Sequence, residues 1–235
     1  MDNSYSDLQR GHVMNELIRF LLNTNSNLLL SVKNVGKTSC LLFLCLFTTP
    51  LKSEELQDVE TLIQNIRSGG YILYMRHAQT NRSQTDTEID DLSDCSTQRN
   101  LSLEGQKQAK LIGNTLQKLN IPIGKINTSP YCRCFDTAQL AFGRADKFSD
   151  LRFTISTNQQ ETQRLAEVLK NLLATEPNAG TNTILVGHTG NLREATGVWP
   201  KPEGVIHIFK PLREKGFEHL GRITPAQWHA LNAEI

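Results

Sequence analysis

Short apolar runs alternate with amphipathic segments over residues 53–235, and this alternation restricts the possible folds more than any other feature of the chain. The runs that read as strands lie at 71–75, 124–128, 151–156, 183–186, 205–209 and 217–223. The segments between them place apolar residues at helical spacing, around 56–66, 109–119, 130–142 and 165–172. Strands and helices that alternate in this way build a mostly parallel sheet with helices on both faces. We therefore expect a three-layer α/β/α sandwich, formed by one domain over residues 53–235.

Capping residues indicate where the helices begin. Ser53 and Ser102 precede two of the amphipathic segments, and Thr224-Pro225 precedes a short C-terminal one. Ser129-Pro130 has the same character, so a helix is predicted to start there and to carry Arg133 in its first turn. An arginine is unfavourable at the positive end of the helix dipole, so its presence there indicates a nearby anion.

Two of the predicted strands end in residues suited to chemistry. The apolar run at 71–75 stops at Arg76 and His77, and the run at 183–186 leads through Gly187 to His188. Residues at the carboxyl ends of strands line the crevice in which open α/β sheets bind ligands. Both histidines are therefore candidate site residues. For each segment taken alone, a strand that simply ends in polar residues is the alternative.

A phosphate monoester is a ligand that these residue types can process. It needs cations around its oxygens, a nucleophile in line with the leaving oxygen, and a proton donor for that oxygen. Imidazole is partly neutral near physiological pH, and one ring nitrogen can attack while a hydrogen bond holds the other. Arg76 and Arg133 can supply paired donors to phosphoryl oxygens.

Four segments in order along the chain resemble motifs of the histidine phosphatase superfamily, the group that includes phosphoglycerate mutases and histidine acid phosphatases. They are 71–78, 100–106, 129–138 and 186–192, and the resemblance extends over roughly 70–225. It implies a phosphoglycerate mutase-like fold and a reaction that passes through a phosphohistidine on His77. It also implies that Arg76, Arg133 and His188 bind the transferred phosphoryl group, in an anion site that uses no metal and no cofactor.

The resemblance also implies substrate contacts in the loop at 78–101. Thr80 matches a threonine of the family pattern, three residues after the histidine, while a later asparagine of the pattern falls on Ser83. The loop is long and polar, as lids and binding loops are. Arg99, near its end, is a candidate ligand for the substrate. A solvated loop with a local ion pair is an equal alternative.

Two departures from the family pattern affect the chemistry. Ala78 replaces the usual glycine after the first histidine, which removes backbone freedom and adds one methyl group. Thr189 stands where one branch of the family has an aspartate that protonates the leaving group. Four carboxylates remain as candidates for the proton donor: Glu161 and Glu203 first, then Asp86 and Asp90. We expect a preference for good leaving groups, such as phosphohistidine or acyl phosphates, because these need less help from an acid.

The segment 33–52 has the plan of a secretory signal peptide. Lys33 and Lys37 precede an apolar run at 40–47, and small and turn-forming residues follow. The run is too short to span a bilayer, which takes about 20 apolar residues. We expect export to the periplasm or the medium, with no stable membrane span in the mature form. An export signal is not usually preceded by a segment such as residues 1–32, to which we assign no function. The alternatives to a signal peptide at 33–52 are therefore a helix packed on the domain or an uncleaved anchor, and the alternative to export is a cytoplasmic protein.

Charge and the spacing of histidines and cysteines indicate whether the chain could bind nucleic acid or a metal, or form disulfides. The net charge of +1 and the scattered basic residues give no electrostatic footprint for nucleic acid. No histidine or cysteine pair has the spacing of a metal site. Cys132 and Cys134 point apart if they are helical, and Cys95 could pair with either of them or with neither.

The leading interpretation is a phosphatase that acts on a small phosphorylated substrate or a phosphoprotein. A phosphate-binding or phosphoprotein-binding module of the same fold, with little turnover, is the alternative because the proton donor is unassigned. A phosphomutase is a minor alternative, since the short chain lacks an obvious lid to exclude water. A structural or interaction protein would leave the four cationic groups unexplained.

Overall fold

The computed structural model describes residues 57–88 and 91–235. The predicted extension at 1–52, its signal-like segment at 33–52, the cap at Ser53 and the candidate Asp90 lie outside the described residues. The first described helix, α2 (Val59–Arg67), begins later than expected from Ser53, because Asp58 caps it by accepting from the backbone N–H of Thr61. None of the described helices is long and apolar enough to cross a membrane.

A six-stranded, mostly parallel sheet forms the centre of the described region, as predicted. Its strands are β1 (Ile72–Arg76), β2 (Ile123–Thr128), β3 (Asp146–Lys147), β4 (Asn182–Gly187), β5 (Ile206–Pro211) and β6 (Phe217–Ile223). They lie in the order β3-β2-β4-β1-β5-β6. The first four in this order are parallel to one another, while β5 and β6 add an antiparallel hairpin beside β1.

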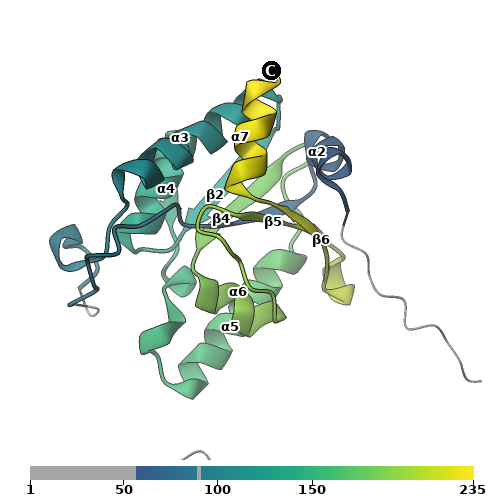
Figure 1. The fold of residues 1–235 in the computed structure, drawn as a ribbon. Helices are drawn as coiled ribbons and strands as arrows, with labels where there is room; N and C mark the ends of the chain where they lie inside the picture. The colour runs from purple at the N-terminus through teal and green to yellow at the C-terminus, as the bar shows by residue number, and fades with distance from the viewer. Residues whose placement is uncertain (1–56, 89–90) are drawn as a thin grey trace, which may run out of the picture. The chain divides into compact units, whose positions relative to one another are not determined.

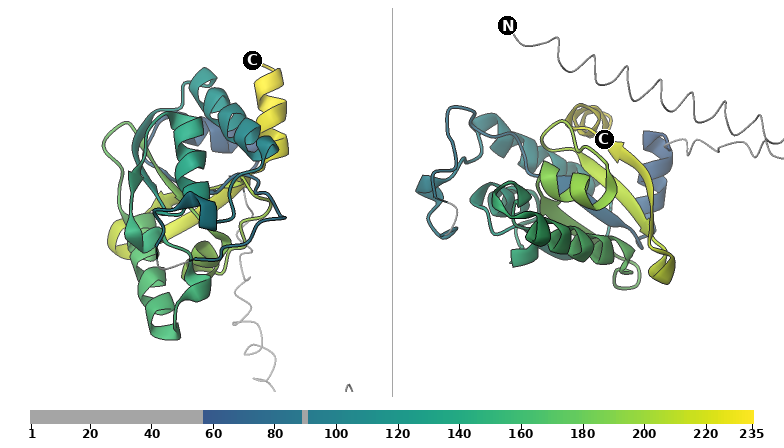
Figure 2. Two further views of the ribbon diagram at one scale, coloured as in Figure 1. Left: turned by 90° about the vertical axis from the view of Figure 1, so that its left-hand side faces the viewer. Right: turned by 90° about the horizontal axis from the view of Figure 1, so that it is seen from below.

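Helices cover both faces of the sheet, so the predicted three layers are present (Figures 1 and 2). One face packs against α2, α3 (Leu103–Lys118), α4 (Cys132–Phe142) and α7 (Pro225–Ala233). The other face packs against α5 (Gln159–Ala174) and α6 (Thr189–Thr196). Figure 1 shows the sheet nearly edge-on, with α3, α4 and α7 above it and α5 and α6 below.

The side chains of β1 show why this strand needs cover on both sides. Leu73 and Met75 belong to the core beneath α2, α3, α4 and α7, whereas Ile72 and Tyr74 belong to the core beneath α5 and α6. All four are at most 1% exposed. Burying an apolar side chain of this size stabilises the fold by roughly 1.5–3 kcal/mol. The strand is therefore held rigidly up to the residue at which Arg76 and His77 follow.

The strand predicted at 151–156 is wrong. Two single-turn 3-10 helices occupy this region, at Ser149–Leu151 and Thr154–Ser156, and the edge strand is the earlier pair Asp146–Lys147. The side-chain amide of Asn191 donates to the carbonyl of Arg152 at 2.7 Å, and it lies 3.4 Å from the carbonyl of Leu151. Because α6 engages these carbonyls, the segment has bonding partners outside the sheet.

Two of the predicted helix starts are confirmed by the structure, and one is wrong. Ser102 caps α3 by accepting from the backbone N–H of Gly105, and Thr224 forms a reciprocal capping box at the start of α7. Ser129 is not an N-cap, because α4 begins at Cys132 with Tyr131 in the capping position. The hydroxyl of Ser129 instead contacts a histidine of the candidate site. Helix α6 was not predicted; it starts directly after His188.

Candidate active site

Three parallel strands deliver the candidate residues to one edge of the sheet. β1 and β4 pair in a register that aligns Arg76 with Gly187, so His77 and His188 leave neighbouring strand ends at the same level. The backbone N–H of His77 donates to the carbonyl of Gly187 at 3.1 Å, and the two imidazole ring centroids lie 5.5 Å apart, edge to face. β2 pairs with β4 on its other side and ends one residue before Ser129. The edge of the sheet indicated by the sequence is therefore where these residues meet.

One hydrogen bond determines which nitrogen of His77 is free to react. Nδ1 lies 2.9 Å from the carbonyl oxygen of Ala78, and Nδ1 must carry the proton because a carbonyl oxygen can only accept. Nε2 of the neutral ring then keeps its lone pair. Burial, followed by the charge of Arg133, holds the pKa of His77 well below its usual range, and Arg76 and Arg99 act in the same direction. The nucleophilic form of the imidazole therefore persists at neutral pH and below.

His188 is held from several sides. Its ring is 1% exposed, its Nε2 lies 2.8 Å from the hydroxyl oxygen of Ser129, and it stacks on Phe153 with ring centroids 4.8 Å apart. The hydroxyl of Tyr74 donates to the His188 carbonyl at 2.7 Å. Gly187 must be a glycine, since a Cβ there would lie 2.4 Å from that hydroxyl oxygen. Burial is the largest cause that holds the pKa of His188 well below its usual range.

Arg133 is a fully buried cation with unused donors. Its Nη1 donates to Oδ1 of Asp86 at 2.8 Å and to the carbonyl of Arg99 at 3.3 Å. The guanidinium carbon lies 4.5 Å from the centre of the Tyr131 ring, a favourable cation–π distance. Nε and Nη2 are buried and make no hydrogen bond within the part of the chain that the structure describes. Buried donors without partners cost free energy, so an anion that accepts from them would be bound favourably.

Arg76 is held in place by Glu203. Its Nη2 donates to Oε1 of Glu203 at 3.2 Å and its Nη1 to the carbonyl of Pro200 at 3.2 Å. Thr80 donates to the same carboxylate through its hydroxyl at 2.9 Å and through its backbone N–H at 3.3 Å. The two predicted residues Thr80 and Glu203 are therefore gathered at the site, where they position Arg76.

Ser83 and Glu161 make their contacts elsewhere. Ser83 is exposed and donates its hydroxyl to the side chain of Asn81 at 2.8 Å. Glu161 forms ion pairs with Arg152 and Arg164, and the hydrogen bonds from Arg164 are the main cause that lowers its pKa. Within residues 57–88 and 91–235, neither side chain contacts the two histidines or Arg133. The same residues contain no group of three or more His, Cys, Asp or Glu side chains that could hold a metal ion.

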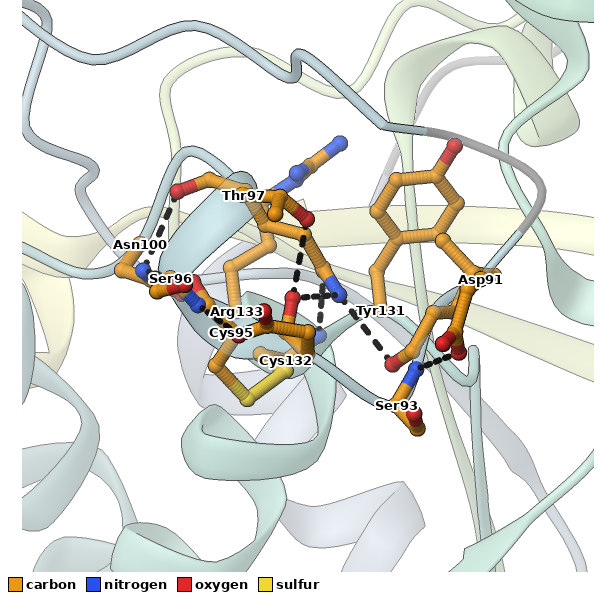
Figure 3. Close-up of a disulfide and its surroundings, with 12 residues drawn as sticks. Asp91, Ser93, Cys95, Ser96, Thr97, Asn100, Tyr131, Cys132 and Arg133 are labelled. Carbon is orange, nitrogen blue, oxygen red and sulfur yellow. Dashed lines mark hydrogen bonds between the residues drawn. A yellow bond between two sulfur atoms is a disulfide. The ribbon is translucent and has the colours of Figure 1, made fainter.

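A disulfide joins the loop before α3 to the first residue of α4 (Figure 3). The sequence left several pairings open, and the structure pairs Cys95 with Cys132 across a Cα–Cα distance of 5.7 Å. The side-chain amide of Asn100 donates to the carbonyl of Cys95 at 2.6 Å, which fastens the end of the loop further. Cys134 remains free, and burial raises the pKa of its thiol to about 12, so it is an unreactive core residue.

Ala78, which stands where the family pattern has a glycine, fits the fold without backbone strain. Its backbone N–H donates to the hydroxyl of Thr137 at 3.0 Å, and its side chain is fully buried. Among the described residues other than glycine, only Asn120 and Arg213 have positive φ, so Ala78 adopts a conformation open to any residue.

The segment 100–106 holds the chain that follows His77. Gly105, in the first turn of α3, packs so closely on the loop that a Cβ would lie 1.8 Å from the carbonyl oxygen of Gln79. The backbone N–H of Ser102 donates to the same oxygen at 3.0 Å. Any larger residue than glycine would therefore displace the loop that leaves the nucleophile.

Several residues of the site were missed or underrated in the sequence. Asp86 was only an alternative proton donor, yet it contacts Arg133 directly. Ser129, Tyr131 and Phe153 enclose His188, and nothing in their spacing distinguishes them from capping and core residues.

Residues 72–155 match the family model described as histidine phosphatase superfamily (branch 1). The matched segment is therefore similar to the histidine phosphatase superfamily. The matched segment contains Arg76, His77 and Arg133, and it ends ahead of His188. This match supports phosphatase activity in general terms. No curated protein gives a significant match to the sequence.

Solved structures similar to this chain include three phosphatases. A protein histidine phosphatase SixA complexed with tungstate is 16% identical, with 66% of this chain and 97% of that chain covered and a TM-score of 0.46. A phosphoserine phosphatase from Entamoeba histolytica is 14% identical, with coverages of 66% and 96% and a TM-score of 0.46. A mycobacterial glucosyl-3-phosphoglycerate phosphatase is 14% identical, with coverages of 64% and 97% and a TM-score of 0.46.

Proposed function

We propose that the chain is a phosphatase that hydrolyses phosphate esters through a phosphohistidine on His77. One observation carries the proposal. A buried neutral imidazole with a free Nε2 lies in the same site as Arg133, a buried guanidinium with two unpartnered donors. A nucleophile and an anion-binding group, both shielded from water, are the components that phosphoryl transfer needs.

In the first step, the lone pair of His77 Nε2 forms a bond to phosphorus while the bond to the leaving oxygen breaks and that oxygen takes a proton. Arg133 and Arg76 bind the equatorial oxygens of the phosphoryl group, and His188 donates to one of them. In the second step, a water oxygen attacks phosphorus while one proton of the water passes to the conjugate base of the acid used in the first step, the P–N bond breaks, and inorganic phosphate leaves with His77 neutral again. Nδ1 keeps its proton throughout because the Ala78 carbonyl accepts from it.

Asp86 is the carboxylate best placed to protonate the leaving oxygen. It contacts the guanidinium that would hold the phosphoryl group, at 2.8 Å. Glu203 is engaged by Arg76 and Thr80, and Glu161 by Arg164. An entering phosphate dianion would compete with Asp86 for Arg133, and two anions brought into contact favour a shared proton. We propose that Asp86 brings this proton and passes it to the leaving oxygen.

The substitution Asp86→Asn is expected to lower kcat on alkyl phosphates by about 10²- to 10⁴-fold, the usual contribution of a positioned acid. Its effect on an aryl phosphate should be much smaller, because a phenolate leaves without a proton. The measurement is kcat on glycerol 3-phosphate and on p-nitrophenyl phosphate. Asp91→Asn is the matched control, since Asp91 lies in the same loop and accepts only from Ser93 among the described hydrogen bonds. Equal losses on both substrates would rule out Asp86 as the acid.

Rapid-quench mass spectrometry tests the function itself. During turnover of p-nitrophenyl phosphate by the protein, a phosphoryl adduct is expected on the peptide that contains His77, and it should decay in acid as phosphoramidates do. A binding module of the same fold would bind inorganic phosphate but would form no adduct and release no nitrophenol. That second outcome would overturn the proposal in favour of the module.

We propose further that the protein works outside the reducing cytoplasm. The Cys95–Cys132 disulfide supports this, because such bonds persist in oxidising compartments such as the periplasm. The signal-like segment at 33–52 points in the same direction. Under this proposal the substrate is a small phosphorylated molecule or an exposed phosphoprotein of that compartment.

A further inference from the structure

Tyr131 is a buried aromatic residue whose packing the core of the fold does not explain. It is only 3% exposed, yet it belongs to none of the three apolar clusters formed by the described residues. It stands directly before α4, in the capping position, but its side chain forms no capping hydrogen bond. Its ring is packed against groups of the candidate active site instead.

The Tyr131 ring contacts two groups that act on the phosphoryl group in the proposed reaction. The guanidinium carbon of Arg133 lies 4.5 Å from the ring centre. The imidazole of His188 lies nearly perpendicular to the ring, with the two centroids 5.0 Å apart. Phe153 completes the arrangement, because it stacks on His188 at 4.8 Å and lies 5.8 Å from the same guanidinium carbon. The two rings therefore pack against both the cation and the imidazole.

An aromatic face holds an arginine differently from a carboxylate. It attracts the charge of the guanidinium through its π electrons and needs no N–H donor in return. Nε and Nη2 of Arg133 make no hydrogen bond within the described part of the chain, so they stay open to an anion while the ring lies beside the group. The ring contact does not depend on the Asp86 carboxylate, with which an entering phosphoryl group competes. It can therefore hold Arg133 when that ion pair weakens.

The chain on both sides of Tyr131 is fastened, which gives the ring a defined position. The backbone N–H of Tyr131 donates to the hydroxyl of Ser129 at 3.3 Å, and this hydroxyl lies 2.8 Å from Nε2 of His188. The next residue, Cys132, is held by its disulfide and by its N–H, which donates to the side-chain oxygen of Gln98 at 3.0 Å. Groups that are ordered before a ligand arrives need not be ordered by it, and this favours binding.

We propose that Tyr131 is a positioning residue: its ring orients the Arg133 guanidinium beside His188, so that the unpartnered donors of Arg133 meet an entering phosphoryl group without rearrangement. The inference rests on the proposed phosphatase function, because the phosphoryl group is the anion concerned. The role belongs to the ring and not to the phenolic hydroxyl, since both contacts are made by the ring.

Calorimetric titration with inorganic phosphate tests this role without turnover. Tyr131→Leu keeps an apolar side chain but removes the π face, and it should weaken phosphate binding about tenfold or more, which corresponds to about 1.4 kcal/mol. Tyr131→Phe keeps the ring and should bind phosphate within about twofold of the unsubstituted protein. Equal losses in the two variants, or no loss in Tyr131→Leu, would overturn the inference.

Phe135→Leu is the matched control for these variants. Phe135 lies on α4 as well and also contacts a cation, but that cation is Lys147, whose Nζ lies 4.9 Å from the ring centre. The affinity for phosphate should stay unchanged in this variant. A loss as large as that in Tyr131→Leu would mean that any aromatic residue of this helix matters, and the specific role of Tyr131 would be overturned.

Graded fluorination separates the π face from the shape of the ring. Phenylalanine with one, two or three ring fluorines, incorporated at position 131, keeps nearly the same shape while its π face becomes less attractive to a cation. The affinity for phosphate should fall stepwise with the number of fluorines, and a constant affinity would overturn the inference. This series replaces Tyr131→Leu if the leucine variant does not fold.

The outcomes for this inference and for the proposed function are distinguishable. Weaker phosphate binding in Tyr131→Leu, with binding retained in Tyr131→Phe, would support the positioning role even if the protein does not hydrolyse p-nitrophenyl phosphate. If it does hydrolyse this substrate, kcat/KM should also fall about tenfold in Tyr131→Leu. Hydrolysis with kcat/KM and phosphate affinity both unchanged in Tyr131→Leu would leave the phosphatase in place and overturn the role of Tyr131.

Discussion

His77→Ala should lower kcat on p-nitrophenyl phosphate by about 10³-fold or more, the scale of loss when a nucleophile is removed. The expectation follows from the geometry at this residue. Its Nδ1 is committed to the Ala78 carbonyl and its Nε2 is free, whereas Nε2 of His188, the neighbouring imidazole, contacts the hydroxyl of Ser129. Steady-state release of nitrophenol over a range of substrate concentrations gives kcat and KM separately.

Two comparisons make the His77 result interpretable. His229→Ala removes an exposed histidine on α7 and should leave kcat unchanged. His77→Asn keeps a polar side chain of smaller volume, which guards against misfolding if the alanine variant is unstable. Should either His77 variant retain kcat within tenfold of the unsubstituted protein while folded, the nucleophile would have to be another group and the proposed mechanism would fail.

Acidification between pH 6.5 and 4 is expected to destabilise the fold strongly. Three buried histidines stay neutral in the folded protein: burial is the main cause that holds the pKa of His77 and His188 well below its usual range, and it lowers that of His207 to about 3. The nearby charges of His219 and Arg222 act in the same direction on His207. In the unfolded chain each of the three would take up a proton near its usual pKa of about 6.5.

The sign of the effect follows from this difference. Below about pH 6.5 the unfolded chain binds protons that the folded protein refuses, so the free energy of unfolding falls as pH falls, by about 1.4 kcal/mol per pH unit for each fully shifted histidine. For His207 the fall ends near pH 3, where the folded protein is protonated as well. Above about pH 6.5 these residues contribute no pH dependence. His207 alone should therefore cost on the order of 3 kcal/mol between pH 7 and pH 4.5.

Urea unfolding at pH 7 and pH 4.5 measures this change. His207→Gln should reduce the loss of stability at pH 4.5, whereas His229→Gln at an exposed position should not. Carboxylates with lowered pKa, such as Glu176 beside Arg213, lose their stabilising contribution only at still lower pH, so they do not obscure this window. If the variant does not fold, the titration of the His207 ring followed by NMR in the unsubstituted protein replaces it. A ring that titrates above pH 6 would contradict the prediction.

The strand-end chemistry could be read from the sequence because it depends on local patterns. His77 and His188 each follow a short apolar run, and parallel strands place the residues after such runs at one edge of the sheet. The position of Arg133 followed from the helix after β2, even though the predicted cap at Ser129 was wrong. The sequence around a serine three residues before a helix is the same whether its hydroxyl caps the helix or, as here, contacts an imidazole.

The missed contacts join residues far apart in the chain. Asp86 and Arg133 are 47 positions apart, and the loop that carries Asp86 has no periodicity from which its path could be inferred. The 151–156 segment has β-branched and aromatic residues that favour a strand, yet the amide of Asn191 on α6 engages its carbonyls. Cys95 and Cys132 lie in two different elements of the fold. The spacing of the cysteines along the sequence does not say how close those elements come to each other.

The covalent link between Cys95 and Cys132 has a consequence for how a substrate enters. A phosphoryl group that binds the free Nε and Nη2 of Arg133 competes with the Asp86 carboxylate on Nη1 for the same guanidinium charge. The disulfide ties the chain to α4 at Cys95, four residues before Arg99. Arg99 therefore stays close to Arg133 when the phosphoryl group binds. Substrate entry then requires at most the opening of one ion pair rather than the movement of a whole loop, and Asp86 can pair fully with Arg133 again once phosphate has left.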